Sequence, residues 1–136
     1  MHLTAYAFEC MNRGMQDSLA TDEFSAWFAA LSEHHAEAVT RAITMLESLG
    51  TDQPRVVSVE VFARLAKYNG TPDTPMRELG VEGTSLHVIF AMEPDDRAVL
   101  LYGYDAERES AVPSVAQAMV AANVLRIYRA SQRKAV

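Results

Sequence analysis

His87 is the residue of this 136-residue chain best suited to acid–base chemistry. An imidazole gains or loses its proton near neutral pH, so it can serve as a general acid or a general base. His87 lies inside the apolar run from Ser85 to Met92, which the composition predicts to be a strand. The alternative interpretation is a core histidine that is hydrogen-bonded to the backbone.

The surroundings of His87 depend on how its strand pairs with the next one. If the two strands pair symmetrically around a turn at residues 93–97, Gly103 lies opposite His87 and leaves open space above the imidazole. Tyr102 and Tyr104 then point to the other face of the sheet. We therefore expect these tyrosines to pack elsewhere rather than beside the histidine.

Two arginines are candidates for binding a phosphate near His87. Arg77 lies within an expected strand, and Arg108 lies in the connection between the last strand and a helix. A guanidinium binds phosphate through paired N–H groups, and connections carry many functional residues. For each arginine the alternative is a solvated surface cation. His87, Arg77 and Arg108 form the predicted catalytic set.

The sequence has no pattern typical of a metal or cofactor site. His34 and His35 are adjacent on an expected helix, so their side chains do not face one ligand. Cys10 is the single cysteine, which excludes an internal disulfide and a cysteine-based zinc site. Phosphate-binding glycine loops, dinucleotide fingerprints and nucleophile elbows are absent from the sequence. We expect neither a metal nor a cofactor.

Composition is that of one small globular protein. The length fits a single domain spanning residues 1–136, with residues 1–14 and 131–136 expected to be loosely ordered. No run approaches the roughly 20 apolar residues that a membrane-spanning helix needs. The N-terminus also lacks the basic start of a signal peptide. We expect a cytoplasmic protein with no membrane partner.

Charge is unevenly distributed along the chain. Residues 112–136 hold four basic side chains and no acidic one, whereas the remainder holds eight basic and eighteen acidic side chains. An acidic body argues against broad contact with nucleic-acid phosphates. The basic segment either complements the dipole of a C-terminal helix or forms a patch for RNA or an acidic partner.

Two helices are predicted before the strands. The first carries four apolar residues at i, i+3, i+4 and i+7: Phe24, Trp27, Phe28 and Leu31. The second carries apolar residues at helical spacing: Ala36, Val39, Ile43 and Leu46. Thr21 can cap the first helix, and Gly50 can end the second by adopting a positive φ. The short link between them predicts an antiparallel helix hairpin.

Strand patterns follow the two helices. Three strands joined by short turns are predicted to form an antiparallel meander: residues 76–81, 85–92 and 98–104. Apolar residues on both faces of the last two strands indicate that both sides of the sheet are covered. The preceding segment, residues 56–67, fits a strand or a short helix equally well. A final helix begins near Pro113. The predicted fold class is α+β, with the helix hairpin packed on a small antiparallel sheet.

Three segments resemble HigB-like toxins of the RelE/ParE superfamily, a group that includes phage-derived host-killing proteins. The first is the acidic and aromatic start of the first helix, residues 21–31. The second is Met76-Arg77-Glu78-Leu79, and the third is the hairpin of residues 87–101 with its Pro-Asp turn and Val-Leu-Leu strand. The resemblance covers roughly residues 15 to 130.

That resemblance implies a microbial-ribonuclease-like sheet with helices on one face. It implies a toxin of a type II toxin–antitoxin module that cleaves messenger RNA, usually on the ribosome, without a metal. In this reaction a base removes the proton of a ribose 2′-hydroxyl, which then attacks the adjacent phosphate. The implied partner is a small antitoxin of the helix-turn-helix type. Assembly into a homodimer stays open.

The chain departs from the family pattern at cationic positions. Gly80 and His87 stand where the family commonly has arginine, and residues 105–107 are Asp-Ala-Glu where it has basic residues. One hypothesis is therefore an endoribonuclease whose catalytic set is rebuilt around His87. The alternative is a binding module of the same superfamily that has lost catalysis and acts through a protein partner.

Overall fold

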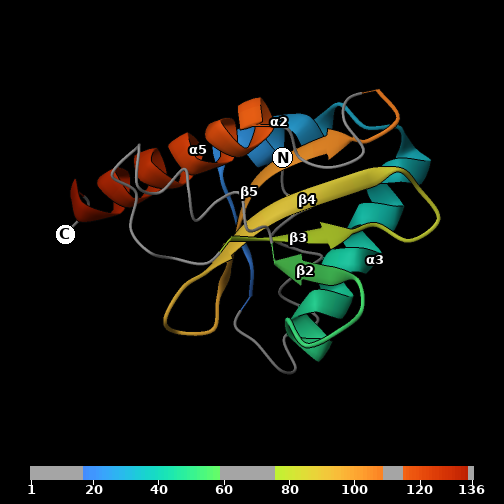
Figure 1. The fold of residues 1–136 in the computed structure, drawn as a ribbon, viewed down its shortest axis with the longest axis horizontal. Helices are drawn as coiled ribbons and strands as arrows, with labels where there is room; N and C mark the ends of the chain where they lie inside the picture. The colour runs from blue at the N-terminus through green and yellow to red at the C-terminus, as the bar shows by residue number, and fades with distance from the viewer. Residues whose placement is uncertain (1–16, 59–75, 109–114, 135–136) are drawn as a thin grey trace.

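Five strands and three helices make up the parts of the chain that the computed structural model describes, residues 17–58, 76–108 and 115–134 (Figure 1). In chain order they are β1 (Leu19–Ala20), α2 (Asp22–Ala29), α3 (Glu33–Leu49), β2 (Val56–Ser58), β3 (Met76–Gly80), β4 (Leu86–Met92), β5 (Ala98–Asp105) and α5 (Val115–Lys134). The strands form one sheet in the order β1-β5-β4-β3-β2. The predicted α+β class is confirmed.

The central part of the sheet is the predicted antiparallel meander of β3, β4 and β5. Two short strands extend it. β2 pairs antiparallel with β3, and β1 pairs parallel with β5, so the whole sheet is mixed rather than purely antiparallel. Residues 56–58 of the ambiguous segment are therefore strand, while the rest of that segment and the loop before β3 lie outside the described residues.

Helix α2 begins directly after Thr21 and helix α3 ends at Gly50, as the sequence predicts, whereas α2 ends at Ala29, two residues before Leu31. The Oγ1 atom of Thr21 accepts a hydrogen bond of 3.2 Å from the Phe24 N–H, which satisfies a donor in the first turn. The same hydroxyl donates to the Leu100 carbonyl at 2.8 Å and so fixes α2 to the middle of β5. Helix α3 ends at Gly50, which has a φ of 74°.

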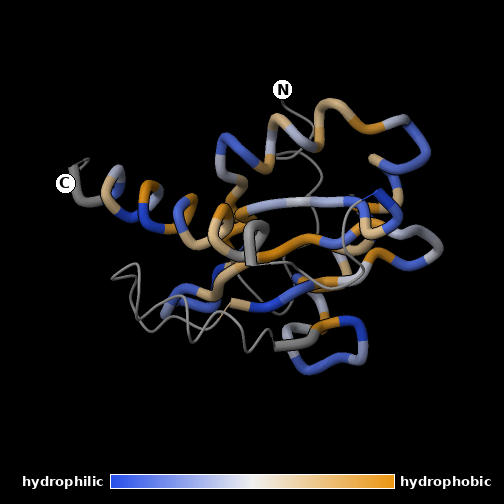
Figure 2. The backbone as a smooth tube through the Cα atoms, turned by 45° about the horizontal axis from the view of Figure 1, so that its top comes forward, coloured by the Kyte–Doolittle hydropathy of each residue, from blue (hydrophilic) through white to orange (hydrophobic). Residues whose placement is uncertain are grey.

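Each face of the sheet has its own hydrophobic core. Helices α2 and α3 cover one face, where Phe24, Ile43 and Phe90 are fully buried. Helix α5 covers the other face through Ala121 and Leu125 (Figure 1). Figure 2 shows hydrophobic segments of the strands in the middle of the molecule, alternating with more hydrophilic ones. The apolar residues on both faces of the strands predicted that both faces would be covered. The family resemblance implied that all helices lie on one face, and this expectation is wrong for α5.

Helix α5 is also longer than expected at its C-terminal end. It continues to Lys134, so residues 131–134, which we expected to be loosely ordered, belong to the helix. The predicted loose ordering of residues 1–14, with Cys10 among them, lies outside the described residues. No helix within the described ranges is both long and apolar enough to cross a membrane.

A buried carboxylate links α3 to the start of β1. The Ser18 N–H donates a hydrogen bond of 2.7 Å to Oε2 of Glu47, a side chain with no exposed surface. The other carboxylate oxygen, Oε1, has no hydrogen-bond partner among the residues that the structure describes. Burial raises the pKa of Glu47 above its ordinary value, and the nearby Asp17 adds to the rise, while the Ser18 hydrogen bond opposes it. The folded protein therefore holds a proton on Glu47 more tightly than the unfolded chain does.

We expect Glu47→Gln to stabilise the protein at pH 7 by about 1 kcal/mol, because a neutral amide costs less to bury than a carboxylate. Because the raised pKa makes the wild type lose stability as the pH rises above the ordinary range of a glutamate, the gain should shrink towards pH 4. Urea unfolding at both pH values measures it. Glu37→Gln, an exposed position on the same helix, is the matched control and should change neither value. Equal stability of the Glu47→Gln protein and the wild type at pH 7 would contradict this account.

Candidate active site

The pairing of β4 with β5 contains an irregularity that changes the candidate site. Symmetric pairing extends from the turn as far as Phe90 opposite Leu100, but the next pair is Ile89 with Tyr102. Leu101 is thus the extra residue of a β-bulge. Beyond a bulge, each residue of the bulged strand moves by one position, and its side chains exchange faces relative to symmetric pairing.

His87 consequently lies opposite Tyr104, and Val88 lies opposite Gly103. The prediction that Gly103 faces His87 and leaves open space above it is wrong, as is the prediction that the tyrosines point away. The physical reason is the bulge, which turns Tyr102 and Tyr104 to the face that carries His87. Gly103 points to the opposite face, where the indole ring of Trp27 lies directly against it.

Three polar side chains from adjacent strands meet on the face that α5 partly covers. Tyr104 of β5 donates a hydrogen bond of 2.7 Å from its hydroxyl to Oε2 of Glu78 on β3. The other carboxylate oxygen, Oε1, lies 3.0 Å from Nδ1 of His87 on β4. The sheet register explains the contact, because His87 pairs with Gly80, two residues from Glu78, and diagonal neighbours on one face are within reach of long side chains.

The carboxylate of Glu78 favours the imidazole tautomer of His87 that carries its proton on Nδ1. Glu78 has 8% of its side chain exposed and His87 has 26%, so the contact is largely shielded from water. Nδ1 has no well-oriented hydrogen-bond partner among the described residues. Its contact with Oε1 is therefore electrostatic, and it becomes an ion pair only when the imidazole is protonated. A carboxylate beside Nδ1 favours the proton on that nitrogen and leaves Nε2 as the atom that can accept another.

Aromatic stacking holds the histidine in place. The rings of His87 and Tyr104 are nearly parallel, at 17°, with centroids 5.3 Å apart. Tyr102 continues the row at 6.3 Å from Tyr104, with an angle of 21°. Tyr104 itself is only 1% exposed, so it is a fixed part of the sheet surface. The imidazole of His87 therefore packs against a rigid surface, and about a quarter of its side-chain surface is exposed to solvent.

Arg77 is not brought together with His87. It pairs with Phe90, whose ring belongs to the core beneath α2 and α3. Residues directly opposite each other in an antiparallel pair share one face of the sheet. Arg77 therefore lies on the far face from His87, and it cannot contact a group bound at Nε2 without a rearrangement of β3.

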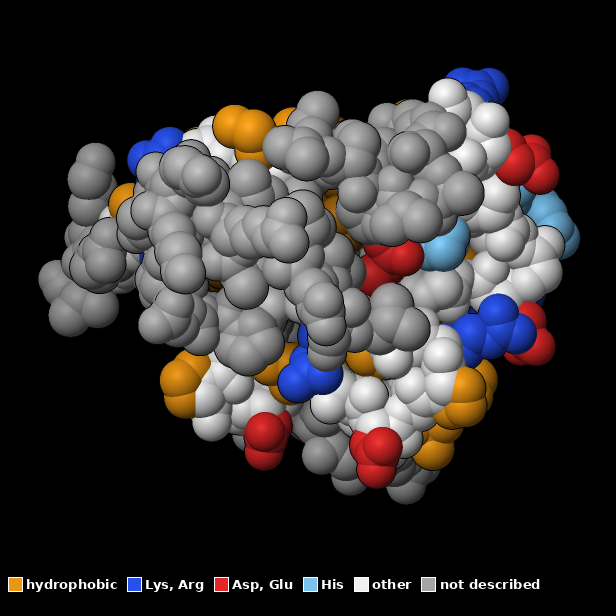
Figure 3. All heavy atoms as spheres, in the orientation of Figure 1, with side chains coloured by type: hydrophobic (Ala, Val, Ile, Leu, Met, Phe, Trp, Pro, Cys, Tyr) orange, Lys and Arg blue, Asp and Glu red, His pale blue; other side chains and the backbone are white. Residues whose placement is uncertain are grey.

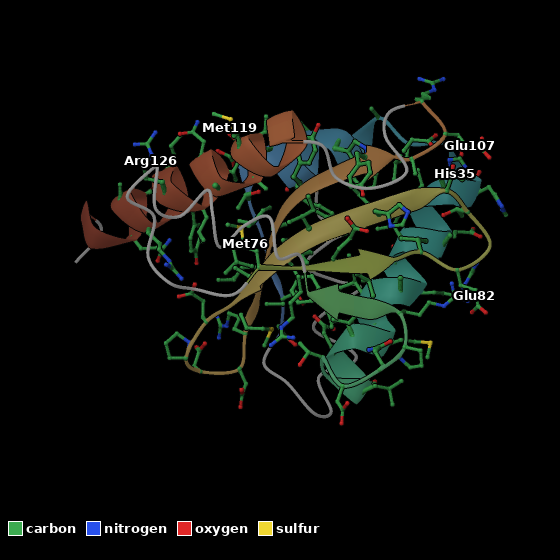
Figure 4. The ribbon with its side chains drawn as sticks, in the orientation of Figure 1. His35, Met76, Glu82, Glu107, Met119 and Arg126 are labelled. Carbon is green, nitrogen blue, oxygen red and sulfur yellow. The ribbon has the colours of Figure 1, made fainter. Side chains whose placement is uncertain are left out.

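Arg108 lies in the turn that follows β5. Its N–H donates to the Asp105 carbonyl at 3.1 Å, and its side chain is exposed. The Ser85 hydroxyl and the Glu107 N–H hold the pKa of Asp105 below its ordinary value, and the charge of Arg108 contributes. In Figure 4, Glu107 and His35 mark this end of the molecule, where β5 ends and α3 begins.

A hollow of about 940 Å³ lies beside the end of β5, and Arg108 and Tyr104 are among the residues that line it. We call it the edge hollow; its lining includes Trp27, His35, Tyr102, Tyr104, Asp105 and Arg108. Tyr104 thus contributes to the edge hollow and to the contacts of His87. His87 itself does not line the edge hollow, so Tyr104 is the residue that the hollow shares with the His87 contacts.

Glu78 and Tyr104 were not among the predicted site residues. Glu78 was visible in the sequence beside Arg77, but only the sheet register shows that it reaches His87. Tyr104 was placed on the wrong face by the symmetric register. No group of three or more histidine, cysteine, aspartate or glutamate residues that could hold a metal occurs within the described part of the chain.

The arrangement defines a small α+β protein consistent with a RelE-like fold, with a His-Glu-Tyr constellation on its sheet. The chain is 37% identical over 79 residues to a protein of Mycobacterium tuberculosis described as "Putative toxin HigB3". The match covers 58% of this chain and 63% of that relative, so it spans less than two thirds of the relative's length. This similarity confirms the predicted resemblance to HigB-like toxins of toxin–antitoxin modules. No family model and no solved structure matches the chain.

Proposed function

We propose that this protein is the toxin of a toxin–antitoxin module and that it cleaves messenger RNA in the cytoplasm, with His87 as the general acid–base residue. The observation that carries the proposal is the placement of His87 against Glu78 and Tyr104 on three adjacent strands. A histidine oriented by a carboxylate is the arrangement that proton transfer requires. The similarity to a described toxin supports the biological role.

In the proposed reaction Nε2 of His87 takes the proton from a ribose 2′-hydroxyl. The 2′-oxygen forms a bond to the adjacent phosphorus, and the bond from phosphorus to the 5′-oxygen of the next nucleotide breaks. The imidazolium then returns its proton to that 5′-oxygen. The products are a 2′,3′-cyclic phosphate and a 5′-hydroxyl, so atoms and charge balance without an additional reactant.

The neighbouring residues have separate roles in this reaction. Glu78 stabilises the imidazolium through Nδ1, because its carboxylate lies 3.0 Å from that atom. Tyr104 fixes Glu78 by its hydrogen bond and supports the ring by stacking. Arg108 contacts the phosphate from the end of the edge hollow, which is where a cation can offset the charge of the transition state. Arg77 has no part in this mechanism, because it lies on the other face of the sheet.

Controlled expression in a bacterial host tests the proposed function. Induction of the wild-type protein should arrest growth and produce discrete cuts in messenger RNA that primer extension can map. Co-expression of a small helix-turn-helix protein encoded beside the gene, the proposed antitoxin, should restore growth. Unimpaired growth together with intact messenger RNA, at a level of folded protein shown by purification, would overturn the proposal.

A second candidate is a binding module that has lost catalysis. It is favoured by the charges around the site: among the described residues that line the edge hollow, Arg108 is the single arginine or lysine, whereas Glu23 and Asp105 are acidic. Acidic side chains repel a phosphate backbone. This candidate predicts that the folded protein binds its partner but leaves RNA intact in a translating extract.

A further inference from the structure

Helix α5 carries an apolar stripe on the side that faces away from the sheet. Its inner side is packed through Ala121, Ala122, Val124 and Leu125, all of which are buried. Met119, Val120 and Ile127 point outwards, with 46%, 43% and 49% of their surface exposed. Met119 and Ile127 are two helical turns apart, so they lie on one side of the helix. Figure 4 shows Met119 and Arg126 projecting from α5 away from the strands.

The same side of α5 is positively charged. Arg126 is exposed, and its guanidinium donates to the Asn123 side chain one turn earlier. Together with Met119, Val120 and Asn123 it lines a shallow hollow of about 330 Å³. The charge of Arg126 is offset by no acid on the helix, because residues 112–136 contain none. Figure 3 shows basic and hydrophobic side chains together over α5.

Arg129 differs from Arg126 because it serves the fold. Its Nη2 lies 3.0 Å from Oε1 of Glu93, in the turn between β4 and β5, and 17% of the Arg129 side chain is exposed. This ion pair fixes the C-terminal half of α5 to the sheet. The outward side of the helix is thus held rigidly while remaining uncovered, which lowers the entropic cost of binding there.

We propose that Met119, Val120, Asn123, Arg126 and Ile127, the outer face of α5, bind an acidic amphipathic helix of a partner protein. Aliphatic side chains and a methionine are suited to packing against the apolar side of another helix, and Arg126 then meets its carboxylates. An RNA would need cations and stacking aromatics, and the described outer face offers one cation and no aromatic ring. A membrane-surface helix characteristically buries bulky tryptophan, phenylalanine or leucine residues, which this face lacks.

This inference does not rest on RNA cleavage, because Met119, Arg126 and Ile127 lie outside the edge hollow, whereas Val120 lies at the border and lines both hollows. Its test uses a fluorescent synthetic peptide of about 20 residues, long enough to form a helix, with leucines on one side and glutamates on the other. Anisotropy titration against the full chain should show binding that weakens as salt is added. A peptide of the same composition in scrambled order should bind at least about tenfold more weakly, because its leucines no longer form one apolar side.

Two variants locate the binding surface. Met119→Glu combined with Ile127→Glu should weaken peptide binding by about tenfold or more, since it places charge in the apolar contact and repels the glutamates. Arg126→Glu should weaken binding similarly without altering the apolar side chains. Leu49→Glu, a change of equal chemistry at a 56% exposed position on α3, is the matched control and should bind as the wild type does. Circular dichroism confirms that each variant is folded.

Several results would overturn the inference. They are the absence of peptide binding, equal binding of the scrambled peptide, or unchanged binding by the folded outer-face variants. Binding of a single-stranded RNA or of anionic vesicles that the double variant abolishes, with no peptide binding, would assign the face to nucleic acid or membrane instead. A dimer that the double variant converts to a monomer, again with no peptide binding, would assign it to a second copy of the chain.

Discussion

His87→Ala should lower the rate of RNA cleavage by about 100-fold or more, the range expected when a general acid–base residue is removed. The loss follows from the geometry, because Nε2 of His87 is the proposed proton acceptor and His87 is the histidine that Glu78 contacts among the described residues. Cleavage is measured in a translating extract by primer extension over time. Growth arrest on induction should disappear in parallel.

The control for this variant is His34→Ala. His34 is exposed on α3, so its removal deletes an imidazole without touching the site. Its cleavage rate should equal that of the wild type. Folding of the His87→Ala protein is checked by thermal unfolding, since about a quarter of the side chain is exposed and its removal opens little space in the core. A folded His87→Ala protein that cleaves as fast as the His34→Ala control would remove His87 from the mechanism.

Gly103→Ala should destabilise the protein by about 1–3 kcal/mol, the usual cost of forcing a methyl group into a filled site. A Cβ atom at position 103 would overlap the six-membered ring of Trp27, so the indole or β5 must move. Urea unfolding measures the change in the free energy of unfolding. Because β5 carries Tyr104, a shift of this strand should lower cleavage activity as well.

Gly80→Ala is the matched control for Gly103→Ala. Gly80 is also a strand glycine, and a Cβ there would find the Arg55 carbonyl at an ordinary 3.8 Å. Replacing Trp27 with Ala in the Gly103→Ala background should recover part of the stability that Gly103→Ala removes, as a double-mutant cycle reveals. Without the bulge, Gly103 would face His87 rather than Trp27. Equal stability of the Gly103→Ala and Gly80→Ala proteins would therefore contradict two observations. These are the overlap of a Cβ at position 103 with Trp27 and the bulged pairing of β4 with β5.

Local signals in the sequence were sufficient for most of the fold. The apolar spacing and the Thr21 cap predicted α2, and Gly50 predicted the end of α3. The strands β3 to β5 followed from their composition and turns. In contrast, β1 and β2 have two and three residues, too few to show an alternating pattern, and their pairing depends on distant segments of the chain.

The candidate site was only partly predictable because it depends on one extra residue. Both faces of β5 are buried, so symmetric and bulged pairing each place apolar side chains on both sides, and the sequence does not distinguish them. The bulge at Leu101 decides that Tyr104 supports His87. The sequence alternation of β3 shows which neighbours share a face with Arg77. It does not show whether His87 on β4 lies on that same face, because this depends on how β3 pairs with β4.

The proposed reaction is tested most directly by the chemistry of the RNA ends. Purified wild-type protein is added to a translating extract, and the cut fragments are analysed by mass spectrometry. We expect a 2′,3′-cyclic phosphate on the upstream fragment and a 5′-hydroxyl on the downstream one, both absent with His87→Ala. Fragments that end in a 3′-hydroxyl and begin with a 5′-phosphate, or RNA left intact by the wild-type protein, would contradict the proposed reaction.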